Sequence, residues 1–176
     1  MKYHQGRVHL YTGNGKGKTT ATLGLALRSG GAGRRSLIIQ FMKGQHYGEL
    51  DAVRRLNGLI TIEQHGSPDF CLPDETNHDH HQQLARGGLV RARQALADPS
   101  LDLVVLDEIV TAVYFQLLND DDIINLLITR QTQQEVALTG RYASPELIKN
   151  CDLVTEMIEH RHYYQAGVND RPGIET

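Results

Sequence analysis

A chain of 176 residues is long enough to bury a substantial core and fits a single domain. Its 40% hydrophobic and 22% charged residues are ordinary for a globular protein, and a net charge of −3 argues against a general binder of nucleic acid or of membrane surfaces. The sequence has no apolar run of membrane-spanning length, no signal peptide and two widely separated cysteines, so we expect a reduced, cytoplasmic setting without membrane contact.

Hydrophobic runs alternate with helix-like segments along the whole chain, which predicts one α/β domain over residues 1–176, built on a largely parallel sheet. The expected strands cover 7–11, 36–41, 59–64, 101–107, 134–139 and 152–157. The expected helices cover 18–31, 80–97, 120–129 and 144–150. Asn119 or Asp120 is expected to cap the third of these helices, and Ser144 the fourth.

The run from Thr12 to Thr20, Thr-Gly-Asn-Gly-Lys-Gly-Lys-Thr-Thr, lies between the first expected strand and the first expected helix. A strand, a glycine-rich turn and a helix form the setting of a phosphate-binding loop, in which backbone N–H groups converge on phosphate oxygens at a helix N-terminus. Lys18 is predicted to reach the phosphates, and the Thr19 hydroxyl to coordinate magnesium. The general motif has glycine at position 12, whereas here Gly13 and Gly15 supply the flexibility. The alternative is a glycine-rich turn with no ligand.

A second candidate part of the site is the apolar run 101–106, which ends in the carboxylates Asp107 and Glu108. In proteins with a phosphate-binding loop, an acidic residue at the end of such a strand holds magnesium. The pair does not specify a reaction, because Glu108 could act either as a metal ligand or as the residue that activates a water molecule. Arg141, which follows the next expected strand in Thr-Gly-Arg, is a further candidate phosphate contact, the alternative being an ordinary turn.

The least regular stretch is 67–83, which contains two prolines, several acidic residues and the histidines 78, 80 and 81. We expect a long loop there, with solvated histidines as the more common outcome and a metal cluster as the alternative. Other isolated features have similar pairs of interpretations. Tyr163 and Tyr164 either pack on their own domain or stack on a ligand ring. Arg34 and Arg35 are expected in a solvated turn, and Arg28 lies either near the phosphates or on a helix surface.

Several sequence motifs occur in the order in which one protein family has them. The loop Gly13–Thr20 is identical to that family's G-N-G-K-G-K-T-T, in which a preceding threonine is normal. Further matches are 39–44 with 48–49 (V-Q-F-x-K-G and G-E), 101–108 (L-D-x-V-x-L-D-E), 139–141 (T-G-R), 151–157 (A-D-x-V-[TS]-E-[ML]) and 166–175 (A-G-[IV]-x-x-x-x-G-I-[ED]). The chain therefore resembles the ATP:corrinoid adenosyltransferases over nearly its whole length.

This resemblance implies a RecA-like P-loop NTPase fold with about six strands. It implies an enzyme that transfers the 5′-deoxyadenosyl group of ATP to the cobalt(I) of a reduced corrinoid and releases triphosphate, in adenosylcobalamin synthesis or salvage. Cobalt is the nucleophile, so the family needs no protein nucleophile or general base. The family also implies a homodimer and a flavoprotein reductant.

The resemblance implies which residues bind ATP, which bind the metal ion and which act in catalysis. ATP is assigned to Gly13, Asn14, Gly15, Lys16, Gly17, Lys18, Thr19, Thr20 and Arg141, and magnesium or manganese to Thr19, Asp107 and Glu108. The residues expected to act in catalysis are Lys18, Thr19 and Glu108.

The departures from the family pattern concern the corrinoid. About a dozen residues precede the loop, where many members have a longer segment that covers the corrinoid on a partner subunit. No tryptophan is present, so Phe70 is the candidate for the aromatic residue after the third strand, and Gln165 replaces an acid. Two rival functions stay open: a hydrolytic ATPase or kinase, and a non-catalytic relative that binds ATP or a corrinoid.

Overall fold

The chain folds around one six-stranded sheet in which every strand is parallel to its neighbours, and the computed structural model describes residues 5–69, 71 and 77–176. The strands are β1 (Val8–Thr12), β2 (Ser36–Phe41), β3 (Ile60–His65), β4 (Leu103–Asp107), β5 (Glu135–Thr139) and β6 (Leu153–Glu156). Their order across the sheet is β3-β2-β4-β5-β1-β6. All six predicted strands are confirmed, with ends that shift by at most two residues. Their carboxyl ends meet at one edge, where open α/β folds bind ligands.

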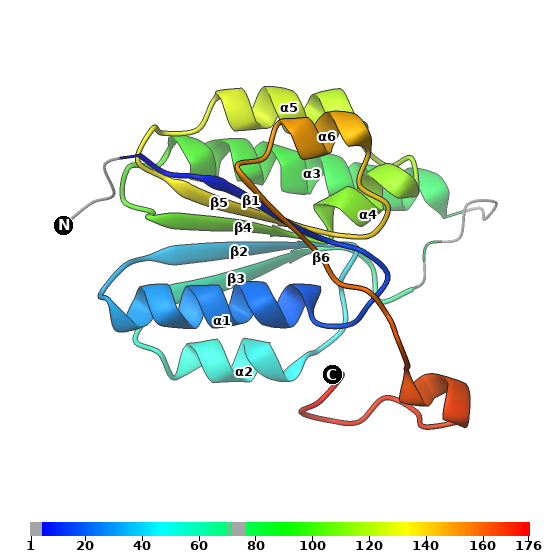
Figure 1. Ribbon diagram of the computed structural model, residues 1–176. Coiled ribbons are helices and arrows are strands. Elements are labelled where there is room, and N and C mark those ends of the chain that lie inside the picture. The colour runs from blue at the N-terminus through cyan, green and yellow to red at the C-terminus, as the bar shows by residue number, and fades with distance from the viewer. Residues whose placement is uncertain (1–4, 70, 72–76) are drawn as a thin grey trace.

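Helices cover both faces of the sheet (Figure 1). On one face lie α1 (Lys18–Gly31) and α2 (Gly48–Arg54), and on the other lie α3 (His78–Ala97), α4 (Ile109–Tyr114), α5 (Asp120–Ile128) and α6 (Pro145–Lys149). Successive side chains along a strand point to opposite faces of the sheet and pack into two separate cores. Ile39 packs on the α3 side, while Ile38 packs with Ala26 of α1. Because both faces are covered, β2 and β4 are buried over their whole length, as the continuous apolar runs predict. The predicted α/β P-loop NTPase-like fold is confirmed.

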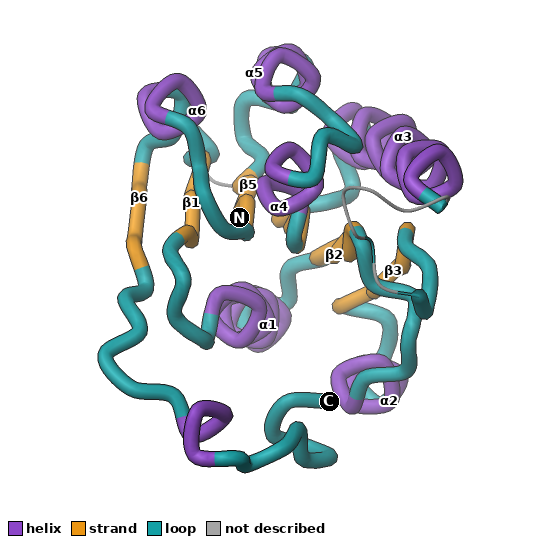
Figure 2. The backbone as a smooth tube through the Cα atoms, turned by 90° about the vertical axis from the view of Figure 1, so that its right-hand side faces the viewer, coloured by secondary structure: helices purple, strands orange, loops and turns teal. Residues whose placement is uncertain are grey.

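The chain after β6 returns to the α1 and α2 side of the sheet (Figure 2). This C-terminal segment, residues 157–176, contains the short 3-10 helix η1 (Tyr163–Ala166). It places the end of the chain near α2, far from β6, and its contacts with the site are described below. Within the described part of the chain, no helix has the length and apolar character that crossing a membrane requires.

The predicted helices are confirmed, and the described residues contain two further short α-helices. Asn119 caps α5 by accepting a hydrogen bond from the Asp122 N–H at 2.9 Å, and Ser144 caps α6 by accepting one from Leu147 at 3.0 Å. The two helices that the sequence did not predict, α2 and α4, have only seven and six residues. So short a segment offers too few turns for a helical period to stand out.

Two predictions away from the site are wrong, and the structure decides between the two alternatives for Arg28. The loop expected over 67–83 ends early, because α3 begins at His78, and His81 is buried in that helix rather than solvated. Arg34 is not in a solvated turn, since its side chain is mostly buried and lies 3.6 Å from the Asp102 carboxylate. Arg28 lies in the last turn of α1, at the end remote from the loop, which excludes the contact with phosphates.

Candidate active site

The glycine-rich run forms the turn between β1 and α1. Thr12 is still a strand residue, whose carbonyl accepts a hydrogen bond from the Met157 N–H at 2.8 Å, so this position needs no glycine. The turn begins at Gly13, with φ of +92°, where a Cβ would lie 2.4 Å from the carbonyl oxygen of Met157. Only glycine fits such a close approach in this left-handed conformation. The departure at position 12 is therefore a shift of the turn by one residue.

Lys18 is enclosed by the loop that it follows. Its side chain is buried, and Nζ donates hydrogen bonds to the carbonyl oxygens of Gly13 at 2.8 Å and Gly15 at 2.7 Å. Burial lowers the pKa of Lys18, with the charges of Glu108, Arg141 and Asp107 as smaller influences. The ammonium lies at the N-terminus of α1, where the helix dipole also favours an anion.

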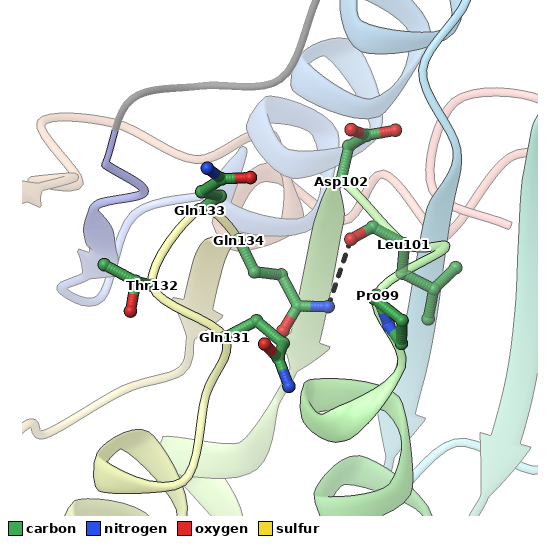
Figure 3. A pocket seen from close by; sticks show the side chains of 7 residues that line it. All are labelled: Pro99, Leu101, Asp102, Gln131, Thr132, Gln133 and Gln134. Atoms are coloured by element: carbon green, nitrogen blue, oxygen red, sulfur yellow. Dashed lines mark hydrogen bonds between the residues drawn. The ribbon is translucent and has the colours of Figure 1, made fainter.

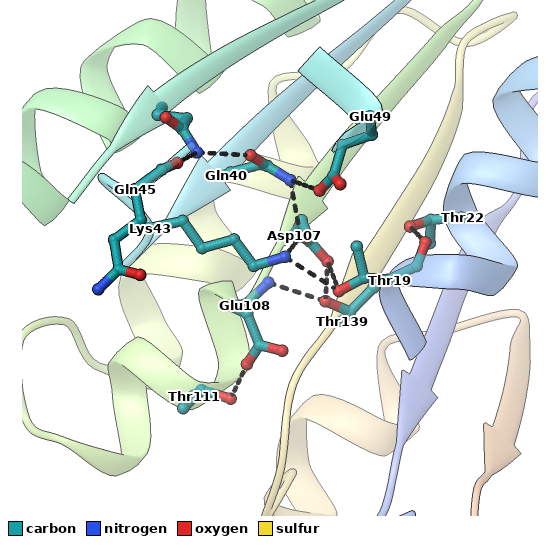
Figure 4. Close-up of polar contacts among 11 residues, drawn as sticks. Thr19, Thr22, Gln40, Lys43, Gln45, Glu49, Asp107, Glu108, Thr111 and Thr139 are labelled. Atoms are coloured by element: carbon teal, nitrogen blue, oxygen red, sulfur yellow. Dashed lines mark hydrogen bonds and ion pairs between the residues drawn. The ribbon is translucent and has the colours of Figure 1, made fainter. Parts of the chain in front are cut away.

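Asp107 is the fully buried centre of the polar network shown in Figure 4. Its Oδ1 accepts hydrogen bonds from the Thr19 hydroxyl at 2.9 Å and the Thr139 hydroxyl at 2.8 Å. Its Oδ2 accepts one from Lys43 Nζ at 2.8 Å. Burial alone would lower the pKa of Lys43, but the attraction of Asp107 outweighs it and raises that pKa. One carboxylate thus fixes side chains from α1, β5 and the loop after β2.

Glu108 and Arg141 are connected through Thr111. The Thr111 hydroxyl donates to Glu108 Oε2 at 2.5 Å and accepts a hydrogen bond from the Arg141 N–H at 3.0 Å. The Glu108 N–H in turn donates to Thr139 Oγ1 at 2.8 Å. These bonds hold the ends of β4 and β5 together, so the acidic pair and the Thr-Gly-Arg turn belong to one site.

A cavity of about 650 Å³ lies over the loop. The predicted residues that line it are Gly15, Lys16, Gly17, Lys18, Thr19, Thr20, Glu108 and Arg141. Asp107 lies next to this set through its bond to Thr19, whereas Gly13 and Asn14 belong to the loop but not to the lining. Phe70 lies outside the described residues, so its predicted contact with the corrinoid stays a prediction.

The C-terminal segment supplies a wall of this cavity that the sequence did not predict. Lys16 Nζ donates to Glu175 Oε1 at 2.7 Å and to the carbonyl oxygen of Ile174 at 3.0 Å. Glu175 also accepts hydrogen bonds from Arg171 and from the Tyr163 hydroxyl. Hydrogen bonds from Arg171 first, then from Lys16 and Tyr163, hold the pKa of the Glu175 carboxyl well below its usual range. Tyr163 therefore packs on its own chain.

Comparison with known proteins decides the family. The model of the family described as ATP:corrinoid adenosyltransferase BtuR/CobO/CobP matches residues 4–176. The chain belongs to this family.

Three relatives give the same result. The chain is 34% identical over 176 residues to the corrinoid adenosyltransferase of Escherichia coli (strain K12), covering 97% of this chain and 86% of that protein. It is 33% identical over 176 residues to corrinoid adenosyltransferase CobA of Salmonella typhimurium, with the same coverage of 97% and 86%. Against the corrinoid adenosyltransferase of Pseudomonas aeruginosa it is 33% identical over 172 residues, covering 97% of this chain and 84% of that protein. The resemblance predicted from the motifs is confirmed.

The donor groups at the site suit a hard divalent cation. Thr19, Asp107 and Glu108 offer one hydroxyl and two carboxylates, the oxygen ligands that magnesium prefers. Among the described residues, no group of three His, Cys, Asp or Glu side chains is arranged to hold a metal ion, and the histidines of α3 form no such cluster.

Lys43 is a further site residue that the sequence did not predict, although it lies in the matched motif 39–44. Its position follows from the strand order, which the structure shows. Parallel β2 and β4 are neighbours, with Gln40 opposite Asp107, so residues just beyond β2 lie beside the acidic pair. Gln40 donates to Glu49 at 3.0 Å and so connects this corner of the site to α2.

A second, smaller cavity of about 250 Å³ lies at the opposite, amino edge of the sheet (Figure 3). Its lining comes from the turns before β4 and β5: Pro99, Leu101, Asp102 and residues 131–134. Gln134 connects the turns around this cavity, because its Nε2 donates hydrogen bonds to the carbonyl oxygens of Ala95 at 3.1 Å and Leu101 at 3.2 Å. This cavity is remote from the phosphate loop, and we assign it to the packing of these turns.

Proposed function

We propose that the chain is a magnesium-dependent ATP:corrinoid adenosyltransferase. It transfers the 5′-deoxyadenosyl group of ATP to the cobalt of a reduced corrinoid and releases triphosphate. Family membership supports the two substrates. The observation that carries the proposal is one cavity in which the phosphate loop, with Lys18 and Thr19 at its end, shares the lining with Glu108 and Arg141.

The reaction makes a limited demand on the protein. Cobalt(I) supplies the electron pair of the new cobalt–carbon bond, the bond between C5′ and its phosphate oxygen breaks, and triphosphate leaves with that electron pair. The nucleophile carries no proton, so the chemistry needs no general base. What remains is to position C5′ and to stabilise the negative charge that grows on the leaving group.

The side chains divide this task. Lys18, Lys16 and Arg141 provide positive charge for the triphosphate, and the loop N–H groups from Gly13 to Thr20 provide hydrogen bonds. Thr19 and Glu108 would hold magnesium, with Asp107 fixing Thr19 and Lys43. Magnesium, when bound, neutralises part of the charge on the leaving group. Glu108 acts here as a metal ligand rather than as a base for water.

The remaining proposals rest on resemblance to the family. We propose one domain over residues 1–176, a homodimer and a flavoprotein that reduces the corrinoid. Size-exclusion chromatography with light scattering tests the dimer, because a monomeric mass at working concentration contradicts it.

Product analysis tests the reaction. The purified protein is incubated without oxygen with ATP, magnesium and chemically reduced cobalamin, and both the cobalamin spectrum and the nucleotide products are followed. We expect adenosylcobalamin and triphosphate in equal amounts. ADP and phosphate would overturn the proposal in favour of a hydrolytic ATPase or kinase. Binding of ATP with neither product would favour a non-catalytic relative.

A further inference from the structure

Two exposed tyrosines pack against each other in a tilted arrangement near the site. Tyr114 ends α4 and Tyr142 lies in the turn after β5, and their ring centroids are 4.3 Å apart at an interplanar angle of 34°. Both are about half exposed, at 53% and 54%. Phe115 meets Tyr114 edge-on at 5.4 Å and extends the aromatic surface. Aromatic side chains normally stabilise a fold by being buried, so packing alone does not explain this pair.

The backbone at Tyr142 gives a second, independent indication. Its φ is +60°, in the left-handed region that a bulky residue rarely adopts. Glycine would adopt this conformation without strain, yet the chain has a large aromatic residue there. Strain that is retained at an exposed side chain beside a site points to a function for that side chain.

Site residues fix the position of the pair. Tyr142 follows Arg141, which lines the cavity, and Tyr114 lies about one helical turn after Thr111, which bonds both Glu108 and Arg141. The turn and the helix touch, because a Cβ at Gly140 would lie 2.4 Å from the Thr111 nitrogen. The tyrosine pair is therefore attached to two residues that line the cavity, Arg141 through the chain and Glu108 through Thr111.

We propose that Tyr114 and Tyr142 form a platform on which one face of the corrin ring packs. This inference rests on the proposed function and extends it to the second substrate, since the cavity over the loop accounts for ATP. A corrin ring is a wide, conjugated macrocycle with apolar faces and amide side chains at its edge. Flat aromatic rings match such a face, and phenol hydroxyls match the amides.

Variants that remove the rings, compared with variants that keep them, distinguish a corrin platform from a purely structural role of the tyrosines. Tyr142→Gly removes one ring and relieves the backbone strain, so the variant is expected to fold, and Tyr114→Ala removes the other. Tyr114→Phe and Tyr142→Phe keep the rings. Ile128→Ala is the matched control, because Ile128 is a 74% exposed apolar residue at the end of α5 and is absent from the lining of the cavity. Thermal unfolding of every variant checks the fold.

Two measurements decide the question. Adenosylation kinetics give separate KM values for reduced cobalamin and for ATP, and anaerobic equilibrium dialysis gives the Kd of cob(II)alamin in the presence of ATP. For the variant lacking both rings we expect KM and Kd for cobalamin to rise about tenfold or more, with KM for ATP within about twofold of wild type. The phenylalanine variants and Ile128→Ala should remain near wild type.

The outcomes separate this inference from the proposed function. Unchanged cobalamin KM and Kd in the double variant would overturn the platform, and so would an equal rise in KM for both substrates. A wild-type protein that binds cob(II)alamin but forms no adenosylcobalamin would overturn the proposed reaction, and the dialysis would still decide the platform. A wild-type protein that binds no cobalamin would overturn both.

Discussion

At the scale of single residues, Lys18 and Lys43 differ in which groups surround their charge. Lys43 has the Asp107 carboxylate at 2.8 Å, which raises its pKa. Lys18 instead donates its hydrogen bonds to two carbonyl oxygens, with no carboxylate partner among the described residues, and burial lowers its pKa. A buried cation without a carboxylate is costly, and an anionic ligand removes that cost. We therefore propose Lys18 as the residue that receives triphosphate, and Lys43 as the residue that supports Asp107.

The change Lys18→Ala tests this difference. We expect kcat/KM for ATP to fall about 10²- to 10³-fold, because the leaving-group charge loses a preorganised cationic partner. Initial rates of adenosylcobalamin formation measure the loss. Lys149→Ala is the control, since that lysine is exposed on α6 and pairs with Glu146, away from the site. Near-normal turnover of Lys18→Ala would contradict the role assigned to the loop.

Glu175 gives the C-terminal segment a predictable pH dependence. Its pKa is lowered in the folded protein, so the stabilisation is fully present above the ordinary glutamate value of about 4.3 and is lost as the pH falls toward the folded value. Hydrogen exchange of residues 163–176, corrected for intrinsic rates and measured from pH 7 downward, should show protection that declines only below the ordinary value. Glu175→Gln should lower protection at every pH. Protection in Glu175→Gln that equals wild type would show that the carboxylate does not hold the segment.

At the scale of elements, the contact between the Gly140 turn and α4 determines the site. Gly140 has φ of +149°, and an added Cβ would collide with Thr111. We expect Gly140→Ala to lower the free energy of unfolding by about 1–3 kcal/mol and to slow adenosylation, because Arg141 and Glu108 are displaced. Gly24→Ala is the opposite case. Gly24 lies within α1, and no atom of the described residues is within 4 Å of an added Cβ, so the change should raise that free energy by about 0.5–1 kcal/mol. Urea denaturation measures both, and changes of the same sign would refute the argument.

The elements also show what the sequence determines locally. Strands β2 and β4 are continuous apolar runs because helices cover both faces, and α1 follows from the loop motif and its length. The residues of the loop and the acidic pair could be predicted for the same reason, since their chemistry is confined to short motifs. The contact between Lys43 and Asp107 depends on which strands are neighbours. The contact between Glu175 and Lys16 depends on the path of the chain after β6. Neither contact leaves a local pattern.

At the scale of the whole molecule, the cavity joins parts of the chain that fold as different layers. The loop follows β1, the acidic pair follows β4 with β5 between them, and the last residues return from the far side of α1 (Figure 2). A ligand in the cavity therefore contacts the sheet edge, α1 and the C-terminal segment at once. Its binding energy should appear in the stability of the entire domain rather than of one loop.

Inorganic triphosphate with magnesium tests this coupling without any chemistry. At a ligand concentration about 100 times Kd, binding to the folded state alone adds about 2.7 kcal/mol. For a domain of this size the gain corresponds to a rise in Tm of about 5–10 °C. Differential scanning calorimetry should show one transition that moves by this amount in wild type and stays in place in Lys18→Ala, whose triphosphate contact is missing. An equal shift in both proteins would place the bound anion away from the loop, and a separate early transition would show that the C-terminal segment does not unfold with the sheet.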